Sequence, residues 1–245
     1  MKSTLLSLFF ILNLCTLTAQ TRNDFSGWGA VFASYKLNDK LSIHFDGQLR
    51  SADEWEKFQS VLLRPGLNYH ISNKAVATVG YAYINNNRIV NSITGWVPEH
   101  RIWQQFIYNQ KFGIAGRSTS FQHRFRFEER FVGTAIAEGN ELVRNDFEFA
   151  ARLRYFIRVI VPLQKTENFT SGAFVALQNE GFFNVKNNDA VTNGKLFDQN
   201  RAYAAIGWRF SSKFDLEAGY MNQSVDGRSI DVSNSIIQLA GYIRM

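Results

Sequence analysis

The sequence predicts an all-β protein, a transmembrane antiparallel up-and-down β-barrel of about 10–12 strands. Three observations indicate this fold: long apolar–polar alternation, an apolar N-terminal leader, and connections that alternate between short and long. Successive side chains of a strand point to opposite faces, so such alternation indicates strands with one apolar and one polar face. A strand that crosses a bilayer needs about 9–11 residues, and several of these stretches are that long or longer.

The clearest alternation lies in residues 121–130 and 147–161. In the first stretch, Phe121, Phe125 and Phe127 share a face with His123, and charged residues occupy the other face. In the second, an apolar face continues from residue 147 to residue 161, with Arg158 among the charged residues between. Ordinary strands have about 5–6 residues, so the length is unusual. The simplest arrangement places the apolar faces on lipid and the arginines in a lumen.

The N-terminus resembles a secretory signal peptide. Lys2 precedes a leucine- and phenylalanine-rich run that is too short for a membrane-spanning helix and ends near Ala19. We therefore predict a cleaved signal at 1–20 and an outer-membrane barrel domain at 21–245. Cys15, the only cysteine, falls in the signal, so the mature chain has no disulfide.

Composition supports a membrane barrel. The chain contains 22 Phe, 9 Tyr and 5 Trp but only 3 Pro. Its mean hydropathy is nevertheless slightly negative, at −0.20. A barrel with an apolar outside and a polar interior has this combination. The net charge of +6 could suggest nucleic acid. We predict no nucleic-acid partner, because the arginines lie on strand faces and the signal peptide directs export.

The elements follow one another as a meander of strands. Tight turns are expected at 38–39, 72–74, 113–117 and 211–213, with a further short connection at 164–168. Long loops are expected at 85–96, 132–144 and 184–196. Short periplasmic turns and long external loops are typical of bacterial outer-membrane barrels, whereas a soluble sandwich would have shorter strands. The candidate strands are 25–37, 41–50, 61–71, 75–84, 97–112, 121–130, 147–161, 173–180, 199–208, 214–223 and 233–245.

The number of candidate strands, eleven, conflicts with a general rule. Single-chain bacterial barrels have even strand numbers. We therefore expect ten strands, if residues 25–37 are not a regular barrel strand, or twelve, if one strand has been missed.

Several motifs carry a resemblance to a known family. They are Trp28, Gln48–Arg50, Gly80-Tyr81, Glu99-His100-Arg101, His123-Arg124-x-Arg126-x-Glu128-x-Arg130, Arg152-x-Arg154 and Gln199-Asn200-Arg201. Together they resemble the Bacteroidota outer-membrane proteins grouped as domain-of-unknown-function family 2490, over nearly the whole mature chain. The resemblance implies an outer-membrane barrel and implies no activity.

The predicted lumen carries a polar network of alternating charge. Guanidinium groups bind carboxylates through paired hydrogen bonds, so these side chains can fill a narrow interior as a structural plug. Asp46 and Asp215 also face inward by parity. The candidate network residues are Arg64, Glu99, Arg101, Arg124, Arg126, Glu128, Arg130, Glu148, Arg152, Arg154, Glu180, Arg201 and Glu217.

Two other functions remain open. Excess arginine in a water-filled pore selects anions, so the alternative is a narrow channel for small acidic solutes such as acidic sugars. An outer-membrane hydrolase is the second alternative, but Gly-x-Ser-x-Gly is absent, and so is any His-rich metal spacing. We predict no catalytic residues, no metal, no cofactor and no enzymatic activity. The expected partners are outer-membrane lipid and small anionic solutes.

Overall fold

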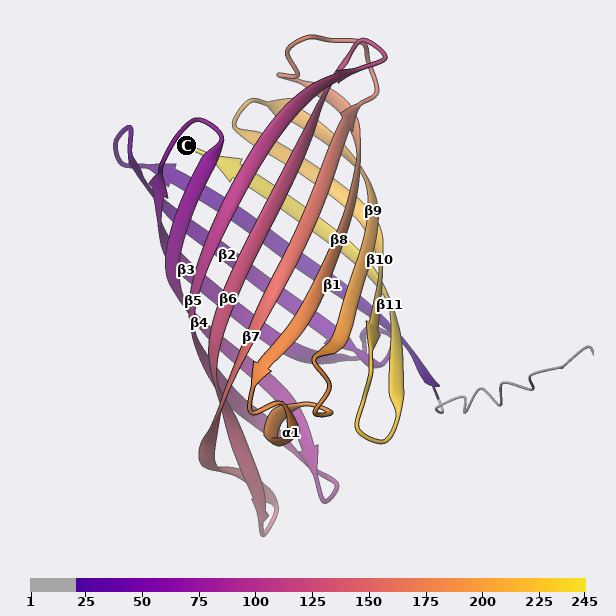
Figure 1. Ribbon diagram of the computed structural model, residues 1–245. Coiled ribbons are helices and arrows are strands. Elements are labelled where there is room, and N and C mark those ends of the chain that lie inside the picture. The colour runs from indigo at the N-terminus through magenta and orange to yellow at the C-terminus, as the bar shows by residue number, and fades with distance from the viewer. Residues whose placement is uncertain (1–20) are drawn as a thin grey trace, which may run out of the picture.

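The structure, a computed structural model, describes residues 21–245, which form one closed β-barrel (Figure 1). The signal peptide predicted at 1–20 lies outside the described residues. Two short helical turns lie in connections between strands: η1 (Asp53–Trp55) and α1 (Asn188–Val191). The strands are β1 (Thr21–Lys36), β2 (Leu41–Ala52), β3 (Lys57–His70), β4 (Ala75–Val90), β5 (Ile93–Ile114), β6 (Arg117–Glu138), β7 (Glu141–Pro162), β8 (Gly172–Lys186), β9 (Phe197–Ser211), β10 (Phe214–Val225) and β11 (Asp231–Arg244).

The barrel closes through a parallel pair between its first and last strands. β1 lies beside β11 in the same direction, from Thr21 opposite Asp231 to Ser34 opposite Arg244. Every other neighbouring pair is antiparallel and sequential, from β1–β2 round to β10–β11. The barrel is all-β, as predicted, but it is mixed rather than antiparallel throughout.

The strand count corrects the expectation of ten or twelve. All eleven candidate strands are present, including β1, which was the one suspected of being irregular. An odd number of up-and-down strands leaves the first and last strands running the same way. A parallel ladder pairs the edge N–H and C=O groups of those strands as an antiparallel ladder would, with slanted bonds. The even-number rule is therefore not a physical requirement for closure.

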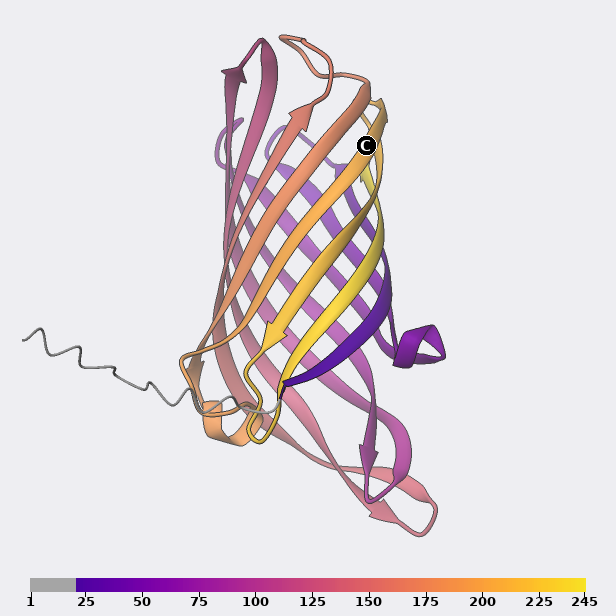
Figure 2. The same ribbon diagram turned by 90° about the vertical axis from the view of Figure 1, so that its right-hand side faces the viewer.

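The connections gather at two ends of the barrel, with Thr21 and Met245 at opposite ends (Figures 1 and 2). The end that carries Met245, uppermost in both views, is called the turn end; its connections are 37–40, 71–74, 115–116, 163–171 and 212–213. The end that carries Thr21 is called the loop end; its connections are 53–56, 91–92, 139–140, 187–196 and 226–230.

Two of the predicted long loops are mostly strand. β4 continues to Val90 and β5 begins at Ile93, so only Asn91 and Ser92 form the turn, with φ of 50° and 67°. Positive φ at both central residues is the geometry of a tight type I′ hairpin. Residues 132–144 likewise form a paired hairpin with a two-residue turn at 139–140. Both hairpins project from the loop end (Figure 2), because backbone pairing continues beyond the apolar part of each strand.

Loop length therefore separates the two ends less cleanly than predicted. The third long loop is present at 187–196 and contains α1. At the turn end, however, the connection 163–171 is longer than the short turn expected at 164–168. No helix among residues 21–245 is long and apolar enough to cross a membrane.

Charged side chains lie inside the barrel and apolar side chains cover its outside. On β6, Arg126 and Glu128 are each 1% exposed, whereas Phe125, next to Arg126, is 47% exposed. On β9, three strands away from β6 around the barrel, Ile206 is 68% exposed. Because side chains alternate along every strand, one register places all the arginine rows inward. This is the reverse of a soluble protein, whose apolar residues gather inside.

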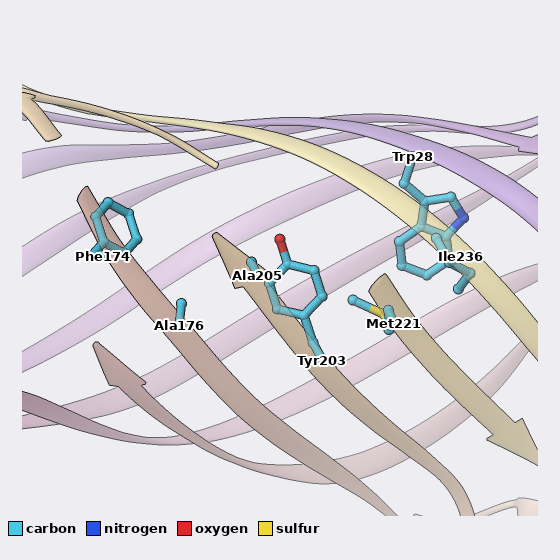
Figure 3. Close-up of a cluster of buried hydrophobic side chains, with 7 residues drawn as sticks. All are labelled: Trp28, Phe174, Ala176, Tyr203, Ala205, Met221 and Ile236. Atoms are coloured by element: carbon cyan, nitrogen blue, oxygen red, sulfur yellow. The ribbon is translucent and has the colours of Figure 1, made fainter. Parts of the chain in front are cut away.

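The interior also has an apolar wall. Trp28 of β1 packs in one cluster with residues of β8, β9, β10 and β11 (Figure 3). The other members are Phe174, Ala176, Tyr203, Ala205, Met221 and Ile236. A second cluster, formed by Leu62, Ala82, Ile84 and Trp103, lies on β3, β4 and β5. The charged residues thus have aromatic and aliphatic neighbours that limit their motion.

Candidate functional site

Glu128 of β6 is the most connected carboxylate of the lumen. It accepts from Arg154 Nη1 at 2.6 Å, from Arg152 Nε at 2.8 Å and from Arg101 Nη1 at 3.3 Å. These arginines come from β7 and β5, the two strands that flank β6. Side chains on neighbouring strands that share a face lie within reach of one another. The alternation of β5, β6 and β7 therefore assembles this cluster.

Glu180 of β8 is the second centre. Its Oε1 accepts from Arg154 Nη2 and from Arg124 Nη2, each at 2.7 Å, and Arg201 lies 3.8 Å away. Because Arg154 bonds Glu128 with one amino group and Glu180 with the other, it joins the two centres. Such paired bonding is a property of the planar guanidinium that lysine does not share.

Glu99 extends the chain of ion pairs toward the loop end. It accepts from Arg101 Nε and from Arg130 Nε, each at 2.7 Å. Arg101 in turn contacts Glu128, so an unbroken series of ion pairs crosses the lumen from Arg130 to Arg201.

Two further pairs lie outside this series. Arg64 of β3 donates to Asp46 of β2 at 2.9 Å. Arg158 of β7 donates to Glu217 of β10 at 2.5 Å, and Tyr242 also donates to that carboxylate at 2.8 Å. The sequence predicted Glu217 as a site residue but did not identify Arg158 as its partner. Arg158 has the same parity as Arg152 and Arg154 on β7, so the alternation rule could have identified it as an inward residue.

One predicted site residue does not join the network. Glu148 was placed inward by parity, but it is exposed and has no ion pair among the described residues. It lies on the part of β7 that pairs with the β6 hairpin near Gly133, where the register shifts. Glu148 pairs with Val132 at the base of the projecting hairpin, and its side chain there is exposed.

Aromatic rings also support several arginines of the lumen. Arg50 lies over Trp28 at 3.8 Å from its ring centre, and Arg201 lies near the same ring at 5.1 Å. Arg126 lies 4.5 Å from the ring centre of Trp103 and donates twice to the amide oxygen of Gln105. Cation–π contacts of this kind are strengthened by desolvation. Arg50, which the sequence-based list omitted, is thereby fixed in the lumen.

The ring of Trp103 occupies a slot that two glycines leave open. Gly66 of β3 and Gly80 of β4 lie opposite each other in the ladder. A Cβ on Gly80 would approach Trp103 Cζ2 to 2.2 Å, and one on Gly66 would approach Cη2 to 2.9 Å. Any larger residue at Gly80 would therefore displace the ring that carries Arg126.

Two cavities lie within the lumen. The central chamber has a volume of about 210 Å³, and the loop-end chamber, which is more open, has about 510 Å³. Four arginines line both chambers and so lie between them: Arg50, Arg64, Arg154 and Arg201. We call these four the arginine partition. Any solute that passed from one chamber to the other would meet them.

The network has more positive than negative charge. Within residues 21–245, we define the lumen network as ten arginines and five carboxylates: Arg50, Arg64, Arg101, Arg124, Arg126, Arg130, Arg152, Arg154, Arg158, Arg201, Asp46, Glu99, Glu128, Glu180 and Glu217. Twelve of the thirteen predicted residues are members. Asp215, also expected inside, is buried near the turn end and pairs with Arg209 and Arg244. A surplus of fixed guanidinium groups favours the binding of anions.

Other chemistry has less support in the structure. The described residues contain no group of three or more His, Cys, Asp or Glu side chains placed to hold a metal ion. Ser42 Oγ lies 2.8 Å from His70 Nε2, but Asn68 donates to the serine rather than orienting the histidine. A nucleophile–base pair is activated when a third group orients the base, and within residues 21–245 the only side-chain partner of His70 is Ser42.

Comparisons with known proteins identify a family and assign no activity. An uncharacterized protein of Methylorubrum extorquens is 25% identical over 199 residues, which cover 80% of this chain and 78% of that protein. The family model of proteins of unknown function DUF2490 matches residues 25–234. That range contains all fifteen residues of the lumen network. The chain therefore belongs to family DUF2490.

Proposed function

We propose that the protein is an integral outer-membrane β-barrel whose lumen is filled by a structural polar plug. The observation that carries this proposal is the distribution of side chains: apolar residues are exposed on the outside of the barrel, and charged residues are buried inside it. In water such a surface would be unfavourable, whereas lipid would cover it. Outer-membrane lipid is then the main partner, and the signal peptide predicted at 1–20 accounts for export.

The plug is supported by the connectivity of the ion pairs. Arg154 links two carboxylates, and the arginine partition lies across the lumen between the two chambers. In a barrel of roughly this size, side chains alone nearly fill the interior. Each strand from β5 to β8 contributes to the series, so the network resists changes in the shape of the barrel. We assign no catalytic role to it, and the Bacteroidota origin stays a prediction.

Membrane integration is tested by fractionation of cells that express the full chain. The protein should be found in the outer-membrane fraction, resist extraction by alkaline carbonate and migrate faster in gels before boiling than after. Recovery as a soluble periplasmic protein would contradict the proposal, whatever the lumen contains.

A second candidate function is a narrow anion channel for small acidic solutes. The specific observation in its favour is the arginine surplus of the lumen network, because a pore lined by excess arginine selects anions. The test is single-channel conductance of the purified barrel in planar bilayers. A channel predicts small anion-selective steps, with selectivity weakened by Arg126→Gln together with Arg154→Gln. A silent bilayer would contradict the channel and favour the plug.

A further inference from the structure

The lining of the central chamber has more arginines than carboxylates. Two carboxylates, Asp46 and Glu180, line it. Seven arginines line the same space: Arg50, Arg64, Arg124, Arg126, Arg154, Arg158 and Arg201. The nearby carboxylates Glu128 and Glu217 compensate part of this charge, but Glu128 is shared with Arg101 and Arg152, which do not line the chamber.

Two of these arginines have neutral hydrogen-bond partners. Arg50 donates to the amide oxygen of Gln48. Arg126 donates to the amide oxygen of Gln105, and its nearest carboxylate, Glu128, is 3.9 Å away. A guanidinium keeps its charge at any relevant pH, so it cannot respond to burial by losing a proton. An uncompensated buried charge is strongly unfavourable. An anion in the chamber would remove this cost.

Unpaired hydrogen-bonding groups are an independent observation at the same place. Arg64 Nε, Arg124 Nε and Trp28 Nε1 are buried and have no hydrogen-bond partner among the described residues. The ring Nε2 of His44 is also buried and has no hydrogen-bond partner among the described residues. All four side chains line the central chamber. Buried N–H groups normally have an acceptor, and the oxygens of an oxyanion would provide several.

The aromatic walls orient the guanidinium groups for such a ligand. Arg124 lies 4.3 Å from the ring centre of Phe156, and Arg158 lies 5.0 Å from that of Tyr242. A guanidinium that stacks by its face keeps its N–H donors at the edges, in the plane where a carboxylate or phosphate binds in two places. The rings therefore contact these guanidinium groups without using their N–H donors.

We propose that the central chamber is a binding site for a small oxyanion, a phosphate or the carboxylate of a compact organic acid. Arg64 and Arg124 are its main ligands, and the ligand supplies the counter-charge that the plug lacks. The chamber of about 210 Å³ exceeds the cavity of about 150 Å³ that accepts a benzene ring, so an acid of one ring fits. The inference rests on the proposed function only in requiring a folded barrel with this charged lumen.

The test is calorimetric titration of the purified full barrel in neutral detergent at constant ionic strength. The probes are inorganic phosphate, glucuronate and, as the uncharged counterpart of glucuronate, glucose. We expect saturable binding of one oxyanion per barrel and no binding of glucose. Tighter binding of phosphate would identify an inorganic ligand, and tighter binding of glucuronate would identify an organic acid; either result supports the oxyanion site.

Variants locate the site. Arg64→Gln together with Arg124→Gln should weaken oxyanion binding at least tenfold. Arg244→Gln is the matched control, because it removes an arginine that pairs with Asp215 and does not line the chamber. Gel mobility before boiling checks that each variant is folded.

Three results would overturn the proposal: no saturable binding of either oxyanion by the folded barrel, equal binding of glucose, or an equal loss of affinity in Arg244→Gln. Failure of the membrane proposal is a separate result, because fractionation of cells measures location and the titration measures binding.

Discussion

Arg154 Nη1 lies 2.6 Å from Glu128 Oε1, although the two residues are not directly opposite in the β6–β7 ladder. In that ladder Arg126 faces Arg154 and Glu128 faces Arg152, so the contact is diagonal. The diagonal contact leaves Arg152 free to bond the other oxygen of the same carboxylate. Arg126 and Arg154 are directly opposite, and like charges in that position repel. The diagonal contact places the carboxylate of Glu128 near both of these arginines.

Glu128→Gln should therefore destabilise the barrel strongly. The change leaves Arg152 without its carboxylate partner and removes one of two partners from Arg154. Removing one member of a buried ion pair costs about 3–5 kcal/mol. Urea unfolding of the refolded barrel in vesicles measures the effect. Glu148→Gln is the matched control on β7, because Glu148 is exposed, and it should change the unfolding free energy little. Similar losses in both variants would contradict the network described here.

Gly80→Ala should disturb the slot that holds Trp103. The added Cβ would lie 2.6 Å from the backbone oxygen of Pro65 as well as close to the indole ring, so movement of the ring alone cannot relieve the clash. Overpacking of this kind costs roughly 1–3 kcal/mol. The same unfolding measurement applies. Gly29→Ala is the control, because a Cβ there meets no atom within 4 Å. A neutral Gly80→Ala would show that the slot is not tight.

The lipid-facing side of β7 can be tested at Leu153, which is 38% exposed. Leu153→Arg would place a charge near the bilayer midplane, at a cost of about 2–4 kcal/mol. Arg152→Leu, one residue away, leaves the lipid contact unchanged, and Glu128 keeps Arg101 and Arg154. We expect Leu153→Arg to reduce assembly into the membrane far more than Arg152→Leu. Equal impairment would mean that the faces of β7 are assigned wrongly.

The orientation in the membrane can be tested with single cysteines, because Cys15 lies in the predicted signal and the mature chain has no other thiol. The loop end should face outward, so Gly139→Cys and Lys195→Cys should react with an impermeant thiol reagent on intact cells. Asn73→Cys, at the turn end, should react only after the outer membrane is broken. The opposite pattern would invert the orientation.

The sequence by itself determined the strands and their faces. Period-two alternation places Arg126 and Glu128 on one face and Phe125 on the other, and no tertiary information is needed for that assignment. The same parity rule identified Arg64, Arg154 and Glu180 as inward residues. It failed at Glu148, because parity states the face of a strand and does not state where the barrel wall ends.

Tertiary structure decided how the barrel closes and which charges meet. The parallel β1–β11 pair depends on two edges that are more than 200 residues apart, and local patterns contain no signal for it. The partnership of Arg158 with Glu217 crosses the lumen between strands that are not neighbours in the ladder. Alternation fixes the direction of a side chain relative to its own strand. Contacts across the lumen depend also on the number of strands and on their stagger, which only the closed barrel sets.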